Sequence, residues 1–104
     1  MPILDVEVIT KASTEVPTGL AARLADAAAE VCGSKAGELW LKLRTLPMRQ
    51  YAECDGGEGV LPVFVSFLMF RQPDVEERKR IASTDSACFA SILDGPAENI
   101  HILF

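Results

Sequence analysis

Pro2 is the clearest candidate for a catalytic residue in the chain, because it directly follows Met1. If Met1 is removed, the chain begins with a secondary amine at the start of an apolar, strand-like run over residues 2–9. A free α-amino group titrates near about 7.7–8.0, and burial or a nearby cation that lowers its pKa by about 1–2 units leaves it largely unprotonated at neutral pH. Such an amine can act as a general base. If Met1 is retained, the proline nitrogen is an amide without basicity.

Composition limits the other functions of the chain. Its 104 residues suffice for one domain with a real core, and 49% hydrophobic against 24% charged residues predicts a folded chain. The net charge of −5 offers no basic surface, so we expect neither nucleic acid nor an anionic membrane as partner. No apolar run reaches the roughly 18 residues of a membrane helix, and no signal peptide is recognisable. We therefore expect a cytoplasmic location.

The cysteines do not indicate a metal or disulfide site. Cys32, Cys54 and Cys88 are an odd number at wide spacing, without a C-x-x-C pair, and the chain has a single histidine. We predict no metal site and no disulfide framework. Cys32 and Cys88 fall in helical stretches and are expected to be small buried side chains. Cys54 lies in a glycine-rich connection, where we expect an exposed thiol without a catalytic role.

Apolar periodicity and capping residues predict two helices. Thr18 stands where the N-cap of the first helix is expected, and Gly33 ends that helix. Asp74 and Glu77 resemble a capping box at the start of the second helix, which continues through Leu93.

Four segments have the pattern of strands, namely residues 2–9, 39–44, 63–70 and 99–104. The second alternates strictly, with leucines on one face and Trp40, Lys42 and Arg44 on the other. The third is apolar on both faces, which predicts a central strand covered on both sides. The turn-rich residues 52–62 form a connection.

The order of elements is therefore β-α-β-β-α-β, and it contains a repeat. Pro2 and Pro62 each open a strand and stand sixty positions apart, so a single domain over residues 1–104 is divided into pseudo-repeats of about 2–48 and 62–104. Two right-handed β-α-β units predict an α+β fold with both helices on one face of a four-stranded mixed sheet. The other face, which carries Trp40, is too apolar for water, and we expect an oligomer to bury it.

Several features combine into a family likeness that covers essentially the whole chain. They are Pro2 after Met1, Val-Pro-x-Gly over residues 16–19, the glycine that ends the first helix, the Leu-Trp-Leu-Lys-Leu strand, the second proline-led strand and the closing Asn-Ile-His-Ile strand. In these features the chain resembles the tautomerase superfamily, which includes 4-oxalocrotonate tautomerase and macrophage migration inhibitory factor. The resemblance implies homotrimers with active sites at subunit boundaries. It also implies acid–base chemistry on small enolisable carbonyl acids, without metal or organic cofactor.

The resemblance also implies roles for individual residues. Pro2 matches the catalytic base, which would move a proton between atoms of the substrate. Arg71 ends the second proline-led strand near a position where family members place an active-site side chain, and it would hold a substrate carboxylate. A solvated arginine leading into a helix is an equal alternative. Tyr51 matches an aromatic pocket position of the shorter members, with core packing or a subunit contact as its alternative.

Three further residues are candidates for substrate binding. His101 stands where some longer members place an active-site aromatic residue, and a structural role is its alternative. Lys35 lies within one place of a family lysine near the pocket. Arg44, on the non-core face of its strand, is a candidate anion contact.

The chain also departs from the family pattern. The first strand ends Thr10-Lys11, without the arginine that 4-oxalocrotonate tautomerase has there, and Trp40 replaces that enzyme's second arginine. A dicarboxylate substrate is therefore disfavoured, and we expect keto–enol tautomerisation of a small 2-oxo acid or an aromatic relative. The alternatives are a non-catalytic, cytokine-like trimeric interaction protein, or a hydratase or decarboxylase, for which the sequence offers no clear acid to activate water.

Overall fold

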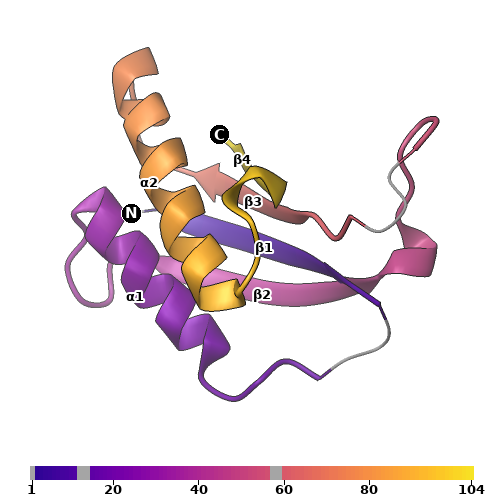
Figure 1. Ribbon diagram of the computed structural model, residues 1–104. Coiled ribbons are helices and arrows are strands. Elements are labelled where there is room, and N and C mark those ends of the chain that lie inside the picture. Colours follow the sequence, from indigo (N-terminus) through magenta and orange to yellow (C-terminus); the bar gives the residue numbers. More distant parts are fainter. Residues whose placement is uncertain (1, 12–14, 57–59) are drawn as a thin grey trace.

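A four-stranded sheet with two helices on one face makes up the protein (Figure 1). The computed structural model describes residues 2–11, 15–56 and 60–104. Its elements are β1 (Ile3–Thr10), α1 (Leu20–Cys32), β2 (Trp40–Pro47), η1 (Met48–Gln50), β3 (Val63–Leu68), α2 (Val75–Leu93), η2 (Ala97–Asn99) and β4 (Ile100–Leu103). The predicted α+β class and element order are confirmed. Among the described residues, no helix is long and apolar enough to cross a membrane.

The sheet has the order β2-β1-β3-β4, and its registers follow the sixty-residue repeat. Ile3 of β1 pairs in parallel with Trp40 of β2, and sixty positions later Val63 of β3 pairs in parallel with Ile100 of β4. The central pair, β1 and β3, is antiparallel. The two β-α-β halves are therefore related by an approximate twofold axis that passes between the central strands.

The core fills the space between the sheet and the helices. Leu4 of β1, Val65 of β3, Leu24 of α1 and Phe89 of α2 are all fully buried there. Alternate residues of each strand point inward, so the strand pattern and the apolar helix stripes face one another. The core thus fixes the register of the sheet, because a slip of one residue would exchange its two faces.

The helix ends agree with the predictions except at one position. Thr18 is not the N-cap of α1; Gly19 is, with a left-handed φ of 86° and no side-chain capping bond. A glycine adopts this conformation without strain, and the turn itself starts the helix. Gly33 ends α1 as predicted, and Asp74 accepts a hydrogen bond of 2.8 Å from the Glu77 N–H at the start of α2.

The strands differ from prediction in their bounds and in the solvent exposure of one face of β3. β3 ends at Leu68, which pairs with Ile3, the first residue of its partner β1. The expectation that residues 63–70 are covered on both sides is wrong for the isolated chain, since Ser66 and Leu68 are exposed. The cysteines of α1 and α2 are half-buried rather than buried, whereas Cys54 is exposed as expected.

The sheet face away from the helices, here called the open face, carries apolar and charged groups in rows. Trp40, Ile3 and Leu68 form one row across β2, β1 and β3. In the next row, Lys42 Nζ lies 3.2 Å from Asp5 Oδ1. This oxygen accepts no hydrogen bond within the described chain, so the contact is an ion pair without hydrogen-bond geometry.

Candidate active site

The N-terminal end of β1 and the chain that follows β3 enclose a pocket around Pro2. Because β1 and β3 are antiparallel and Ile3 pairs with Leu68, Pro2 stands beside the residues that leave β3. The pocket has a volume of about 330 Å³ and is open to solvent. Its lining residues are Pro2, Cys32, Ser34, Met69, Phe70 and Arg71.

Pro2 is held in this pocket by the sheet. Its side chain is buried, and its carbonyl accepts a hydrogen bond of 3.1 Å from the Trp40 N–H, which ties the start of β1 to β2. Arg71 is exposed at the pocket rim. Of the residues selected from the sequence, the structure therefore brings Pro2 and Arg71 together.

A buried carboxylate lies behind this pocket. Asp85 of α2 is fully buried, and neither of its carboxylate oxygens has a hydrogen-bond partner in the described part of the chain. Burial raises the pKa of Asp85 to about 7. Burial also raises the pKa of the Cys32 thiol, with a further rise caused by Asp85. The Cys32 thiol is therefore neutral at physiological pH and is not an activated nucleophile.

The sequence reasoning missed Asp85, although a signal was present. Asp85 stands four positions after Ile81 and four before Phe89, at the centre of the apolar stripe of α2. Residues at this spacing share one helix face, so a carboxylate there has to be buried.

Arg80 fixes the end of α1 that borders the pocket. One of its terminal nitrogens donates a hydrogen bond of 3.0 Å to the Val31 carbonyl, and its Nε donates one of 3.0 Å to Glu77 Oε2. A helix leaves its last carbonyls without intrahelical donors, and Arg80 satisfies one of them from the neighbouring helix. This contact holds Cys32 in place at the pocket wall.

Tyr51 and His101 lie elsewhere, around the ring of Phe64. Tyr51 is 5.9 Å from Phe64 between ring centroids, and His101 stacks on the same ring at 5.4 Å. The Tyr51 hydroxyl donates a hydrogen bond of 2.7 Å to Glu53, and this bond raises the pKa of the phenol. Both predicted residues therefore belong to one aromatic cluster.

Arg44 joins the same region through Glu7. Its Nε donates a hydrogen bond of 3.2 Å to Glu7 Oε2, and Glu7 pairs in register with Phe64. At about 3.3 Å per residue, the five residues from Pro2 to Glu7 place this row about 16–17 Å along β1 from Pro2. Within one chain, Arg44, Tyr51 and His101 cannot reach a small molecule bound at Pro2.

Lys35 lines a separate hollow beside the end of α1. Its backbone N–H donates a hydrogen bond of 2.8 Å to Glu38 Oε1. Only Ser34 lines both this hollow and the pocket around Pro2. Among the described residues, no three His, Cys, Asp or Glu side chains gather in a group that could hold a metal ion.

Comparisons with known proteins agree on the architecture. No protein-family model and no curated protein matches this sequence. Solved structures do match, including a fused 4-OT in a symmetric trimer, with 15% identity, a TM-score of 0.76 and coverage of 97% of this chain and 81% of that one. The chain has the tautomerase fold. A second such structure, Leishmania major MIF2, has 17% identity and a TM-score of 0.74, covering 99% of this chain and 85% of that one.

The tautomerase fold also carries other chemistry. FG41 malonate semialdehyde decarboxylase, inhibited by 3-bromopropiolate, matches with 17% identity and a TM-score of 0.72, over 97% of this chain and 79% of that one. One fold thus supports different reactions, so the reaction has to be argued from the side chains at Pro2.

Proposed function

We propose that this chain is a cofactor-independent tautomerase that interconverts the keto and enol forms of a small 2-oxo acid, with Pro2 as general base after removal of Met1. One observation carries the proposal: in a tautomerase fold, the buried Pro2 shares its pocket with the guanidinium of Arg71.

Pro2 transfers the proton in this reaction, and Arg71 binds the substrate. Burial disfavours the ammonium form of the Pro2 amine, and the positive charge of Arg71 acts in the same direction. The unprotonated amine removes a proton beside the substrate carbonyl and returns it to the other end of the enol system. Arg71 holds the substrate carboxylate through paired hydrogen bonds, which positions the acidic carbon next to the amine.

The pocket also limits the class of substrate. Among the described residues that line it, Arg71 is the one cationic side chain, while Met69 and Phe70 present apolar surface. A monocarboxylate with an apolar body fits this lining better than a dicarboxylate, because a second buried carboxylate would have no cation. Phenylpyruvate is the corresponding test substrate.

The active unit is proposed to be a homotrimer. The fused 4-OT structure is a trimer, and the open face of this chain exposes Trp40 by 54% and Leu68 by 65%. A second copy packed on this face would bury that apolar surface. It would also carry its own Tyr51 and His101 toward the Pro2 pocket of its neighbour, which these residues do not reach within one chain.

The test of the catalytic base starts from protein whose N-terminal residue has been identified by mass spectrometry. Enol–keto conversion of phenylpyruvate is measured for processed wild type, for Pro2→Ala and for Pro62→Ala, the matched proline that opens the repeated strand. We expect Pro2→Ala to lower kcat/KM about 10²–10⁴-fold, because the base is replaced by a differently oriented primary amine. Pro62→Ala should retain activity. Equal rates for wild type and Pro2→Ala would reject the mechanism, and absence of activity in the processed wild type would favour a non-catalytic interaction protein.

The role of Arg71 is tested in the same assay. Arg71→Ala is expected to raise KM about tenfold or more, since a charge-assisted bond to the carboxylate is lost. Arg71→Lys should recover part of this loss. Arg23→Ala removes an exposed arginine of α1 and serves as the control. Equal KM values for all three variants would assign Arg71 to the solvated surface.

A further inference from the structure

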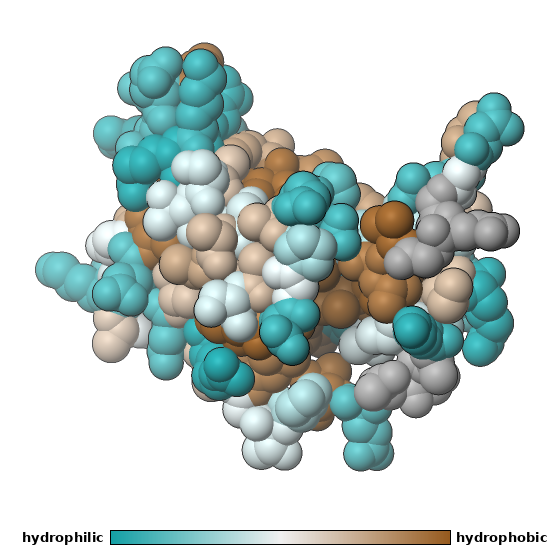
Figure 2. Space-filling view, viewed as in Figure 1, coloured by the Kyte–Doolittle hydropathy of each residue, from teal (hydrophilic) through white to brown (hydrophobic). Residues whose placement is uncertain are grey.

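A second hollow lies at the other end of β1 from Pro2. It has a volume of about 510 Å³ and is formed by the end of β1, the start of β3 and the turn after α2. The space-filling view shows hydrophobic side chains gathered in this region beside the helical layer (Figure 2). A volume of this size lies within the range of small-molecule sites.

The internal repeat relates this hollow to the pocket around Pro2. Of the residues that line the Pro2 pocket, Met69, Phe70 and Arg71 correspond after a shift of sixty positions to Ile9, Thr10 and Lys11, which all line the larger hollow. In the same way Ser34 corresponds to Asp94, which also lines it. The larger hollow is therefore the counterpart of the Pro2 pocket in the second half of the chain.

The counterpart lacks the catalytic amine. The position equivalent to Pro2 is Pro62, which is buried inside the chain between Leu61 and Val63. Its nitrogen is a tertiary amide and has neither a proton to give nor a basic lone pair. A molecule in this hollow can be bound, but it cannot undergo the proton transfer proposed for Pro2.

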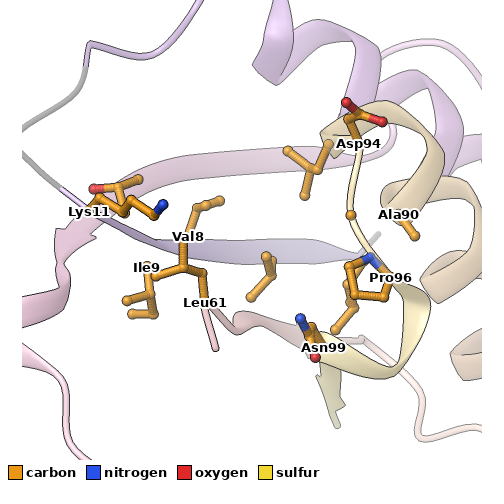
Figure 3. Close-up of a pocket in the computed structure, with 13 residues that line it drawn as sticks. Val8, Ile9, Lys11, Leu61, Ala90, Asp94, Pro96 and Asn99 are labelled. Carbon is orange, nitrogen blue, oxygen red and sulfur yellow. The ribbon is translucent and has the colours of Figure 1, made fainter. Parts of the chain in front are cut away.

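The lining of the hollow indicates the kind of molecule that fits. Figure 3 shows the Lys11 side chain beside Val8, with its nitrogen directed toward Val8, Leu61 below and Pro96 and Ala90 on the opposite side. Lys11 supplies one ammonium group at the position where the Pro2 pocket has its guanidinium. Most other walls are apolar, and the polar side chains that remain are Thr10, Asn99 and Asp94.

We propose that this hollow is a second, non-catalytic binding site for a small apolar monocarboxylate, with Lys11 as its anion contact. Asp94 at the rim opposes the negative charge of such a ligand and limits its affinity. Binding in this hollow does not depend on proton transfer at Pro2, so either property can be absent without the other.

The test uses phenylacetate, an arylacetate that lacks the 2-oxo group of phenylpyruvate. It is titrated into the isotopically labelled chain, and binding is followed by NMR. We expect saturable shifts of the Val8, Ala90 and Leu93 signals in wild type and in Pro2→Ala alike. Lys11→Met, which keeps the aliphatic chain and removes the charge, should weaken binding at these signals about tenfold or more. Lys11→Arg should restore it, and Lys79→Met, an exposed lysine of α2, is the control.

A second variant changes the affinity in the opposite direction. Asp94 has a left-handed φ of 57°, a conformation that asparagine tolerates well, so Asp94→Asn removes the charge without disturbing the turn. It should tighten phenylacetate binding severalfold. Unmoved signals at millimolar phenylacetate, or equal affinities for wild type, Lys11→Met and Asp94→Asn, would overturn the proposal.

Discussion

At the scale of single residues, Asp85 carries the largest electrostatic cost described in the chain. Its folded pKa of about 7 lies above the ordinary value of 3.8, so between these values the folded protein keeps a proton that the unfolded chain has released. Stability therefore falls as pH rises from about 4 to about 7, and the full cost of about 4 kcal/mol is present above pH 7. Below pH 4 both states are protonated and the cost is absent.

Asp85→Leu is expected to stabilise the protein in a pH-dependent manner. The gain in free energy of unfolding should be about 2–3 kcal/mol larger at pH 8 than at pH 5, because only the ionised carboxylate carries the cost. Urea unfolding at the two pH values measures it. Asp26→Leu, an exposed position of α1, is the control and should change stability equally at both pH values. A gain for Asp85→Leu that does not depend on pH would contradict this account.

At the scale of elements, the turn after α1 decides where the pocket wall begins. Gly33 has a φ of 68°, and this left-handed turn directs the chain from Cys32 to Ser34, both of which line the Pro2 pocket. A Cβ placed on Gly33 would meet no atom within 4 Å. The cost of a side chain there is therefore backbone strain and not a clash.

Gly33→Ala is expected to lower the free energy of unfolding by about 1 kcal/mol through this strain. Gly33→Asn should lower it less, because asparagine tolerates the left-handed region. Gly95→Ala provides the matched control: its Cβ would also meet open space, and its φ lies outside the left-handed range. Urea unfolding midpoints of the three variants measure these differences in stability. An equal loss for Gly33→Ala and Gly95→Ala would show that φ is not the cause.

At the scale of the whole molecule, the open face is the expected site of assembly. Leu68→Glu places a charge in the apolar row formed with Trp40 and Ile3, and burial of that charge between copies is costly. We expect the mass by light scattering to fall from that of three 11.3 kDa chains to that of one. Val75→Glu, exposed by 54% on α2, is the control and should remain assembled. An unchanged mass for Leu68→Glu would place the interface elsewhere.

Mixed assemblies test whether a neighbour completes the Pro2 site. Chains carrying Pro2→Ala and chains carrying His101→Ala are unfolded together and refolded. If His101 acts across a boundary, about a quarter of the sites in random trimers combine an intact Pro2 with an intact His101 from the neighbour. Activity should then exceed the average of the two separate variants. Activity equal to that average would argue against a shared site.

The sequence predicted the elements because each is governed by local chemistry. Alternation placed Trp40 and Arg44 on the non-core face of their strand, and the sixty-residue spacing of Pro2 and Pro62 indicated the duplicated β-α-β order. The N-cap at Thr18 was wrong because a glycine turn one residue later supplies the start of the helix without a side-chain bond. Local rules rank such competing starts poorly, since both cost little energy.

Only the tertiary structure decided which of these residues meet. The antiparallel pairing of β1 with β3 sets Pro2 beside Arg71, whereas Tyr51 and His101 gather around Phe64 at a distance that one chain does not bridge. The same pairing creates the counterpart hollow at Lys11. Such contacts depend on register between strands far apart in sequence, and the packing of the shared core sets that register.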